Sequence, residues 1–368
     1  MHSEVGLNVR DVSTPAVVID LDVLERNLAR MADYCSTHGI GLRPHTKTHK
    51  TIEAARRQLE LGAIGLTVAK VGEAEVMVAA GAREIMVAHP IIGDEKLRRL
   101  AALTFKTDII VAVDSLTTAQ SLSRIAIETG CQFGIVVEFD SGSLRCGVTP
   151  GRHAAELGKQ ISTLPNLKLR GLFTYFGSVW GGPAERATEI EHVTSAVSAT
   201  IAAFRAAGLS TEIVSAGSTP AAELSHLVPG ITEIRPGTYI YNDLNTCYQG
   251  LCSLDDCAVT VVTTVVSTAV PGHVIVDAGS KTLSSDLLSA GPKRGYGYVR
   301  DAGATLTRLN EEHGFLSADD LSQFSVGEVL SVIPNHVCTC INMHDEVLLA
   351  RAGKIVDSWT VAARGKVR

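Results

Sequence analysis

The chain has 368 residues, of which 45% are hydrophobic and 20% are charged, and its formal net charge is −6 at pH 7. This length exceeds what one compact core usually serves, so we expect one large domain and one smaller domain. The negative charge disfavours a nucleic-acid or membrane-surface partner, because both select a basic protein face. No run of 18 apolar residues is present, so the sequence predicts no helix that spans a bilayer.

The first residues and the cysteines indicate a cytoplasmic protein. Residues 1–15 are mixed polar and lack the basic start and the apolar stretch of a signal peptide. Eight cysteines stand at scattered spacings, at positions 35, 131, 146, 247, 252, 257, 338 and 340. We therefore expect reduced thiols and not a disulfide framework.

Apolar strands and amphipathic helices alternate through the first two thirds of the chain. The first strand is predicted at residues 15–22 (PAVVIDLD), and apolar residues at helical spacing follow it up to Gly39. The unit then recurs, with strands predicted at 40–45, 64–69, 84–90, 109–114, 133–140, 169–175, 211–217 and 232–243. About eight such units predict a closed (β/α)8 barrel over residues 14–245. A doubly wound open sheet is the alternative, disfavoured because no Gly-x-Gly-x-x-Gly follows the first strand.

The pattern changes after residue 245. Alternating or β-branched runs are separated by Gly, Pro and Asn, at residues 257–270, 273–279, 328–334, 345–353 and 354–365. Helical periodicity is almost absent there. We expect residues 246–368 to form a smaller, mostly antiparallel β-domain, which residues 1–13 can join as a strand.

A basic segment, RPHTKTHK, ends the second predicted strand of the series at residues 43–50. One interpretation is a solvated basic loop. The other starts from the position of Lys47, because the carboxyl ends of barrel strands carry the functional residues of such folds. A lysine there can act as a nucleophilic amine and form a Schiff base with an aldehyde cofactor.

Two turns of small residues are candidates for a phosphate site of such a cofactor. Ser215–Thr219 (SAGST) and Arg235–Thr238 (RPGT) follow successive predicted strands. Each turn alone resembles a plain loop. Loops after the last two strands recur as phosphate sites in barrels, where backbone N–H groups and hydroxyls hold the anion. We therefore expect the two turns, including Thr219 at the end of the first, to supply a phosphate site.

With these motifs, the chain resembles the fold-type III pyridoxal-5′-phosphate (PLP) enzymes, and within them the D-threonine aldolase and D-serine dehydratase group. The resemblance runs from TPAVVIDLDVLERN to WTVAARG, is most specific in RPHTKTHK, and includes GLTVAKVGEAEVM and EFDSGSLRCGV. It implies that Lys47 carries PLP as a Schiff base. It also implies that Arg145 reaches the cofactor and that Tyr175 stands near cofactor and substrate. The phosphate of the cofactor would be held by Gly217, Ser218, Gly237 and Thr238.

Arg235 resembles the arginine of alanine racemase that hydrogen-bonds the pyridine nitrogen of PLP, where aldolases of the group tend to have glutamine. An arginine there keeps that nitrogen unprotonated and weakens the cofactor as an electron sink. The alternative is a structural ion pair at the barrel rim.

His336 and Cys338, in the segment PNHVC, are the candidate metal ligands. Two residues at i and i+2 on a strand face the same way, so both can bind one ion. The motif is weak alone, but the resemblance implies a divalent metal beside PLP. A thiolate ligand favours zinc, whereas manganese or magnesium suits the aspartate found there in some relatives. His344 and Asp345 are the competing pair, disfavoured because adjacent strand residues point to opposite faces.

The resemblance implies a homodimeric lyase whose substrate is a D-β-hydroxy-α-amino acid. Retro-aldol cleavage gives glycine and an aldehyde, whereas dehydration gives a 2-oxo acid and ammonia. Gly181 stands where aldolases of the group carry a histidine, and it favours dehydration together with Cys338. Overall similarity, including AGSKTLSSD at 278–286, favours the D-threonine aldolase type, which we expect.

Two more remote functions remain as alternatives. An amino-acid racemase needs a tyrosine base from the β-domain, and the sequence nominates none. A non-catalytic PLP-binding protein is usually a bare barrel, so the second domain disfavours it.

Overall fold

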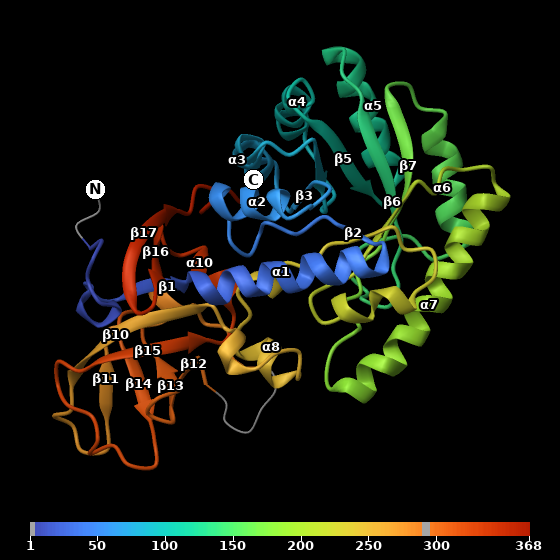
Figure 1. Cartoon of the computed structure of the whole chain (residues 1–368). Helices are drawn as coiled ribbons and strands as arrows, with labels where there is room; N and C mark the ends of the chain where they lie inside the picture. Colours follow the sequence, from blue (N-terminus) through green and yellow to red (C-terminus); the bar gives the residue numbers. More distant parts are fainter. Residues whose placement is uncertain (1–3, 289–294) are drawn as a thin grey trace. The chain divides into compact units, whose positions relative to one another are not determined.

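The computed structural model describes residues 4–288 and 295–368, which fall into two compact units (Figure 1). The barrel unit contains residues 30–47, 52–237 and 366–368, and the β-unit contains the described residues of 1–29, 48–51 and 238–365. The chain therefore leaves the barrel unit directly after Lys47 and again directly after Gly237. Within the described ranges, no helix has the length and apolar composition that a membrane crossing requires.

A parallel sheet of eight strands forms the centre of the barrel unit, in the spatial order β2-β9-β8-β7-β6-β5-β4-β3. Hydrogen bonds close the ring between its first and last strands, because Ile64 N donates to Leu42 O and Thr67 N donates to Pro44 O. The predicted (β/α)8 barrel is thereby confirmed. Its strands are β2 (Gly41–Leu42), β3 (Leu66–Val68), β4 (Glu84–Val87), β5 (Asp108–Val113), β6 (Phe133–Glu138), β7 (Leu167–Phe173), β8 (Ile213–Ala216) and β9 (Glu233–Ile234).

Helices join consecutive barrel strands, and Figure 1 shows α4 to α7 outside the strands. The strands β5 and β6 are buried on both faces and therefore read as continuous apolar runs in the sequence. Local signals set the helix limits: the Ser115 side chain caps α5, which ends at Gly130 with φ 68°. The helices are α2 (Ile52–Glu60), α3 (Val71–Met77), η2 (Val78–Ala80), α4 (Asp94–Leu103), α5 (Leu116–Thr129), α6 (Arg152–Ser162), α7 (Pro183–Ala206) and η3 (Ala222–Leu227).

The β-unit contains a nine-stranded sheet in the order β11-β14-β13-β12-β15-β10-β1-β16-β17, and β10 also pairs with β11. Six strands thus close a small ring, and β1, β16 and β17 extend it. All pairs are antiparallel except β1 with β16, which confirms the mostly antiparallel β-domain. The strands are β1 (Ala16–Asp20), β10 (Val259–Ser267), β11 (Val274–Val276), β12 (Gly297–Val299), β13 (Ala304–Leu309), β14 (Gly314–Ser317), β15 (Val329–Pro334), β16 (Glu346–Arg351) and β17 (Lys354–Thr360).

Short helices connect these strands, and the longer helix α1 starts in the β-unit and ends in the barrel unit. Near the start of the chain, Gly6 N donates to Ile355 O and Val9 N donates to Gly353 O, so these residues join β17. The helices are η1 (Val9–Asp11), α1 (Leu21–His38), η4 (Thr238–Ile240), α8 (Leu244–Tyr248), η5 (Leu254–Asp256), α9 (Ser280–Leu283) and α10 (Val337–Ile341).

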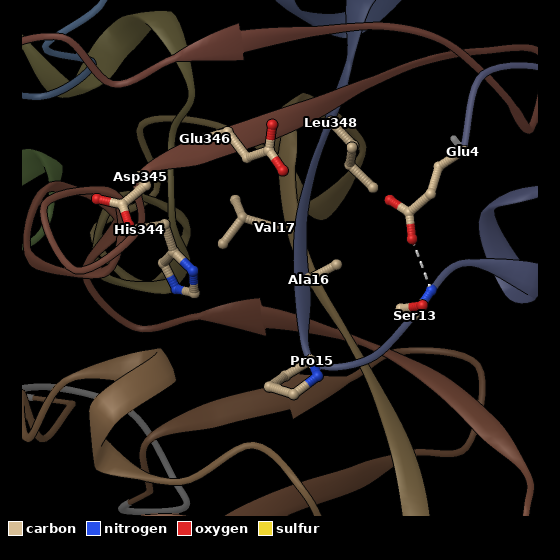
Figure 2. A pocket seen from close by; sticks show the side chains of 9 residues that line it. All are labelled: Glu4, Ser13, Pro15, Ala16, Val17, His344, Asp345, Glu346 and Leu348. Atoms are coloured by element: carbon tan, nitrogen blue, oxygen red, sulfur yellow. Dashed lines mark hydrogen bonds between the residues drawn. The ribbon is translucent and has the colours of Figure 1, made fainter. Parts of the chain in front are cut away.

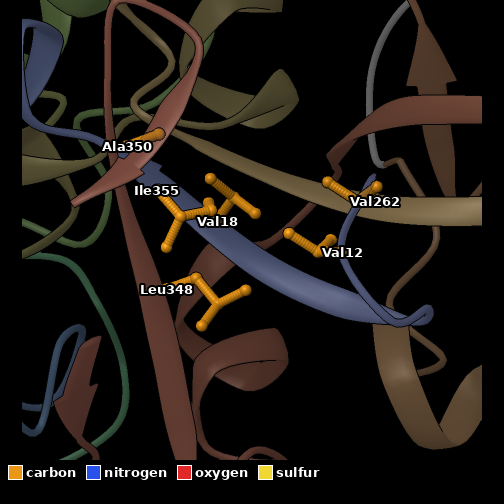
Figure 3. Packing of buried hydrophobic residues seen from close by; sticks show 6 residues of the cluster. All are labelled: Val12, Val18, Val262, Leu348, Ala350 and Ile355. Atoms are coloured by element: carbon orange, nitrogen blue, oxygen red, sulfur yellow. The ribbon is translucent and has the colours of Figure 1, made fainter. Parts of the chain in front are cut away.

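The strand predicted at residues 15–22 is not part of the barrel, so its assignment as the first barrel strand is wrong. β1 pairs antiparallel with β10 and parallel with β16. An apolar run that is buried on both faces suits either sheet, and tertiary packing makes the choice. Figure 3 shows the apolar cluster that holds β1 in the β-unit, made of Val12, Val18, Val262, Leu348, Ala350 and Ile355.

Candidate active site

Lys47 lies in a turn after the carboxyl end of β2. Its side chain is exposed, whereas Thr46 before it and Thr48 after it are buried. Lys47 N donates to His45 Nδ1 at 3.4 Å, and Thr46 N donates to Thr67 O at 2.9 Å. The turn is therefore fixed by its backbone, and the Lys47 side chain extends from it towards solvent.

The segment 43–50 is not a solvated basic loop, because its first residue is buried inside the barrel unit. Arg43 is 1% exposed, and its Nε and Nη2 donate to the two carboxylate oxygens of Glu233, each at 2.9 Å. Arg43 Nη2 also lies 2.9 Å from Glu84. A bidentate pair with this geometry fixes the course of the chain three residues before Thr46.

Arg235 continues this polar network on the next strand. The side chain is 5% exposed, with Nη1 2.5 Å from Ser215 Oγ and Nη2 2.7 Å from Thr174 O. Ser215 Oγ in turn donates to Glu233 Oε1 at 2.5 Å. Burial lowers the pKa of Arg235 to about 10, although the Glu233 carboxylate opposes this shift. The guanidinium is thus linked to a buried carboxylate through one hydroxyl and is not at a rim ion pair.

Glu138, the last residue of β6, is a site candidate that sequence reasoning missed. It is 3% exposed, and within the described residues its Oε2 has no hydrogen-bond partner. Burial and the Asp114 carboxylate raise the pKa of Glu138 to about 7, against the opposing charges of Arg235 and Arg145. Its only signal in the sequence is its place at the start of EFDSGSLRCGV, and a glutamate at a strand end is otherwise unremarkable there.

Arg145 and Tyr175, predicted from the resemblance, lie together after β6 and β7. The Arg145 Cζ atom is 4.5 Å from the centroid of the Tyr175 ring. Asp140 Oδ1 accepts hydrogen bonds from the backbone N atoms of residues 142, 143 and 144, which shapes the loop that carries Arg145. Ser141 Oγ donates to Tyr175 O at 3.3 Å and ties this loop to the next strand end.

The two predicted phosphate turns also meet. Gly237 N donates to Thr219 Oγ1 at 3.3 Å, and Ser218 is buried with its Oγ 3.2 Å from Phe176 O. Gly217 has φ 92°, a left-handed conformation that favours glycine. Thr238 is different, because it belongs to the β-unit, where its Oγ1 lies 3.7 Å from Cys338 Sγ.

His336 and Cys338 are not on a strand, so the geometric reason given for pairing them is wrong. β15 ends at Pro334, His336 is the N-terminal cap of α10, and Cys338 lies in the first turn of that helix. The extended backbone of His336, with φ −134° and ψ 103°, nevertheless brings the two side chains together. A hydrogen bond to Cys338 raises the pKa of His336 to about 9, against the effect of burial.

Asp286 orients His336, and it is the second residue that sequence reasoning missed. His336 Nδ1 lies 2.8 Å from Asp286 Oδ2, which also accepts from Thr339 Oγ1 at 2.7 Å. A carboxylate at Nδ1 fixes the orientation of the imidazole ring, as the partners of metal-binding histidines do. Asp286 is the last residue of AGSKTLSSD and lies 50 residues before His336 in the chain, so no local sequence pattern predicts that the two side chains meet.

His336 and Cys338 remain a pair of candidate ligands within the described part of the chain. No group of three or more His, Cys, Asp or Glu side chains converges there or elsewhere in it in a geometry that could hold a metal ion. Thr48, next to Lys47 in the chain, has its Oγ1 3.2 Å from Cys338 Sγ. An imidazole and a thiol with one oriented partner suit an open site that completes its coordination with non-protein ligands.

The competing pair, His344 and Asp345, lines a pocket of the β-unit beside β1 and β16 (Figure 2). His344 Nε2 is 3.0 Å from Thr282 O, and burial lowers the pKa of this imidazole. Asp345 forms an ion pair with Arg364 at 2.9 Å. The two side chains are therefore directed to different partners.

Gly181 precedes α7 and has φ 91°. A Cβ atom at this position would lie 2.5 Å from Glu185 Oε2. The structure therefore accommodates no histidine here without moving Glu185, which agrees with the absence of one from the sequence.

Comparison with known proteins covers both units. The family model for the alanine racemase N-terminal domain matches residues 19–245, and the model for a serine dehydratase domain matches residues 258–350. A D-threonine aldolase of Arthrobacter sp is 33% identical over 360 residues, covering 96% of this chain and 93% of that protein. A D-threo-3-hydroxyaspartate dehydratase of Delftia sp. is 35% identical over 349 residues, covering 89% and 91%. The crystal structure of D-threonine aldolase from Filomicrobium marinum superposes with a TM-score of 0.92 at 33% identity, covering 100% of both chains.

Proposed function

Because this chain belongs to the alanine racemase-like family of PLP enzymes, in the group of D-threonine aldolases and D-serine dehydratases, we propose that it is a PLP- and metal-dependent lyase of D-β-hydroxy-α-amino acids. The proposed reaction is D-threonine aldolase-like cleavage to glycine and an aldehyde. One observation supports the proposed PLP- and metal-dependent lyase above others: Thr48, the residue after Lys47, contacts Cys338. Thr48 and Cys338 both belong to the β-unit, so the segment that directly follows the proposed cofactor lysine contacts a proposed metal ligand.

The barrel residues fit PLP. Lys47 would hold the aldehyde, Arg145 and Tyr175 would contact the cofactor, and the turns around Ser218 and Gly237 would hold the phosphate together with Gly217, Thr219 and Thr238. Arg235, with N–H groups beyond those given to Ser215 and Thr174, would face the pyridine nitrogen. The unpartnered Oε2 of Glu138 is the observation that favours a bound polar group, since a buried carboxylate oxygen normally has a partner. Bound PLP supplies an electron sink for negative charge at the substrate Cα.

His336 and Cys338 fit a divalent metal ion. An imidazole and a thiolate together favour zinc over the harder manganese and magnesium ions. Asp286 would fix the ring of His336, and the open positions would take oxygen atoms of the substrate. A bound metal ion would supply a Lewis acid.

Lys47 and Arg145 have separate proposed roles in the reaction. The Lys47 Nζ atom would take the proton from the substrate Cα in dehydration, or would return a proton to the Cα of glycine after cleavage. The positive charge of Arg145 would be held over the Tyr175 ring and stabilise negative groups next to it.

Dehydration to a 2-oxo acid and ammonia is the second candidate function, favoured by Gly181 and by the thiol ligand Cys338. Product analysis separates the two reactions. Protein loaded with PLP and zinc is incubated with D-threonine, D-serine and D-threo-3-hydroxyaspartate, and glycine is measured against 2-oxo acid. Glycine with acetaldehyde from D-threonine supports the aldolase, whereas a 2-oxo acid with ammonia supports the dehydratase. If neither glycine nor a 2-oxo acid forms, the proposed lyase is overturned and a racemase or a PLP-binding protein is favoured.

From the same membership we propose a homodimer that works in the cytoplasm on a small D-amino acid. Light scattering coupled to size-exclusion chromatography measures the mass of the particle, and a value near that of one 38.9 kDa chain would contradict the dimer.

A further inference from the structure

Three cysteine side chains meet in the β-unit, at a place that the proposed reaction does not use. Cys247 lies in α8, Cys252 follows four residues after the end of that helix, and Cys257 directly follows η5. Cys247 Sγ is 3.5 Å from Cys252 Sγ and 3.4 Å from Cys257 Sγ. A disulfide has a sulfur–sulfur distance of about 2.0 Å, so bond formation requires a closure of about 1.5 Å.

The three thiols are chemically unequal. Hydrogen bonds to Cys247 and Cys257 lower the pKa of Cys252, whereas hydrogen bonds to Cys247 and Cys252 and burial raise the pKa of Cys257. Cys247 and Cys252 are partly exposed, while Cys257 is buried against Leu244 and Ile333. Because the thiolate is the reactive form of cysteine, we expect an oxidant in solution to react first with Cys252.

We propose that Cys252 and Cys247 form an oxidation site, at which a peroxide converts the two thiols to a disulfide. The Cys252 sulfur attacks a peroxide oxygen, so an S–O bond forms, the O–O bond breaks and one water leaves. Cys247 sulfur then displaces the hydroxyl from Cys252, so the S–S bond forms and a second water leaves. The two sulfur atoms together lose two electrons, the peroxide gains them, and the two thiol protons end in water.

The disulfide would act through α8 on the metal loop, which we define as residues 336–338 with the two proposed metal ligands. Asp243 caps α8 by accepting from Thr246 N, and its other carboxylate oxygen accepts from Val337 N at 3.1 Å. Val337 is the residue between His336 and Cys338. A closure of Cys247 towards Cys252 therefore shifts the helix whose cap supports this loop, a consequence that rests on the proposed function.

The oxidation site can be tested by peptide mapping of the holoenzyme. The protein is treated with hydrogen peroxide, remaining thiols are alkylated, and chymotrypsin cleaves after Tyr248, Leu251 and Leu254, which separates the three cysteines. We expect a linked fragment pair that contains Cys247 and Cys252, is 2 Da lighter than the two thiol fragments together, and separates on reduction. Alkylated Cys252 after peroxide, or a disulfide between other cysteines, would overturn the proposal.

Variants sharpen the test. In Cys247→Ser the linked pair should vanish and Cys252 should gain oxygen atoms, because the resolving thiol is absent. Cys35→Ser is the matched control, since Cys35 is buried and burial raises its pKa to about 12. Wild type should lose lyase activity reversibly on oxidation, and Cys252→Ser should keep it under the same peroxide. If the disulfide forms but wild type and Cys252→Ser respond alike to peroxide, only the coupling to the metal loop is overturned, and the oxidation site stands.

Discussion

The barrel unit and the β-unit place their polar groups by different means. In the barrel unit, Arg43, Ser215, Glu233 and Arg235 come from three adjacent strands, and hydrogen bonds join them into one buried network. In the β-unit, Asp286 lies in a segment after α9, and His336 caps a short helix after β15. A site at parallel strand ends therefore follows from strand order, whereas a site built from irregular segments depends on contacts across 50 residues of chain.

The largest expected effect is in the barrel unit, at Lys47. Lys47→Ala should abolish both turnover and the visible absorbance band of covalently bound PLP, because the variant lacks the amine that would form the Schiff base. Absorbance spectra and activity assays measure the two losses. Lys50→Ala is the matched control: Lys50 Nζ donates to Asn342 at 2.7 Å, and its loss should leave the band intact. Turnover by Lys47→Ala would refute the proposed role.

The buried network predicts a large loss of stability. Arg43→Met leaves the Glu233 carboxylate buried without its bidentate partner, which should lower the free energy of unfolding by about 3–5 kcal/mol. Urea denaturation followed by circular dichroism measures this change. Arg99→Met serves as the control, because its partner Glu75 is far more exposed and the pair contributes about 0–1 kcal/mol. Equal losses in both variants would erase the distinction between interior and surface pairs.

Glu138 predicts a dependence of stability on pH. The folded protein holds the Glu138 proton up to a pKa of about 7, whereas the unfolded chain releases it near 4.5. The folded state therefore binds more protons between these values, and its stability falls as pH rises from 4.5 to 7, by about 3 kcal/mol. Glu138→Gln should flatten this slope in urea titrations of cofactor-free protein at several pH values. An unchanged slope would mean that other groups cause it.

The smallest expected effect is in the β-unit, at Asp286. Asp286→Asn weakens the acceptor at His336 Nδ1 and should lower zinc affinity by about 10–100-fold, as for other partners of metal-bound histidines. Equilibrium dialysis measures the affinity. His336→Ala should remove most of the binding, and Asp320→Asn, at an exposed carboxylate that accepts from Ser322, should leave it unchanged. If Asp286→Asn binds zinc as the wild type does, orientation by Asp286 is unnecessary.

The amino-acid sequence by itself determined the barrel, the second β-rich unit and the position of Lys47. Apolar runs that alternate with amphipathic helices have few folded solutions, since parallel strands must be covered on both faces. Because the strand order of a barrel is then fixed, the residues at successive strand ends share one rim. The family membership also follows from contiguous motifs, of which RPHTKTHK is the most specific.

Tertiary structure alone decided where β1 belongs, how His336 meets Cys338 and which residues support them. An apolar strand such as β1 is equally suited to either sheet, and its register with β10 and β16 made the choice. His336 and Cys338 meet through a helix cap that no strand periodicity describes. Asp286, Glu138 and the thiols of Cys247 and Cys252 gain their chemistry from burial and from hydrogen-bond partners that folding brings near, and these quantities are set by packing in three dimensions.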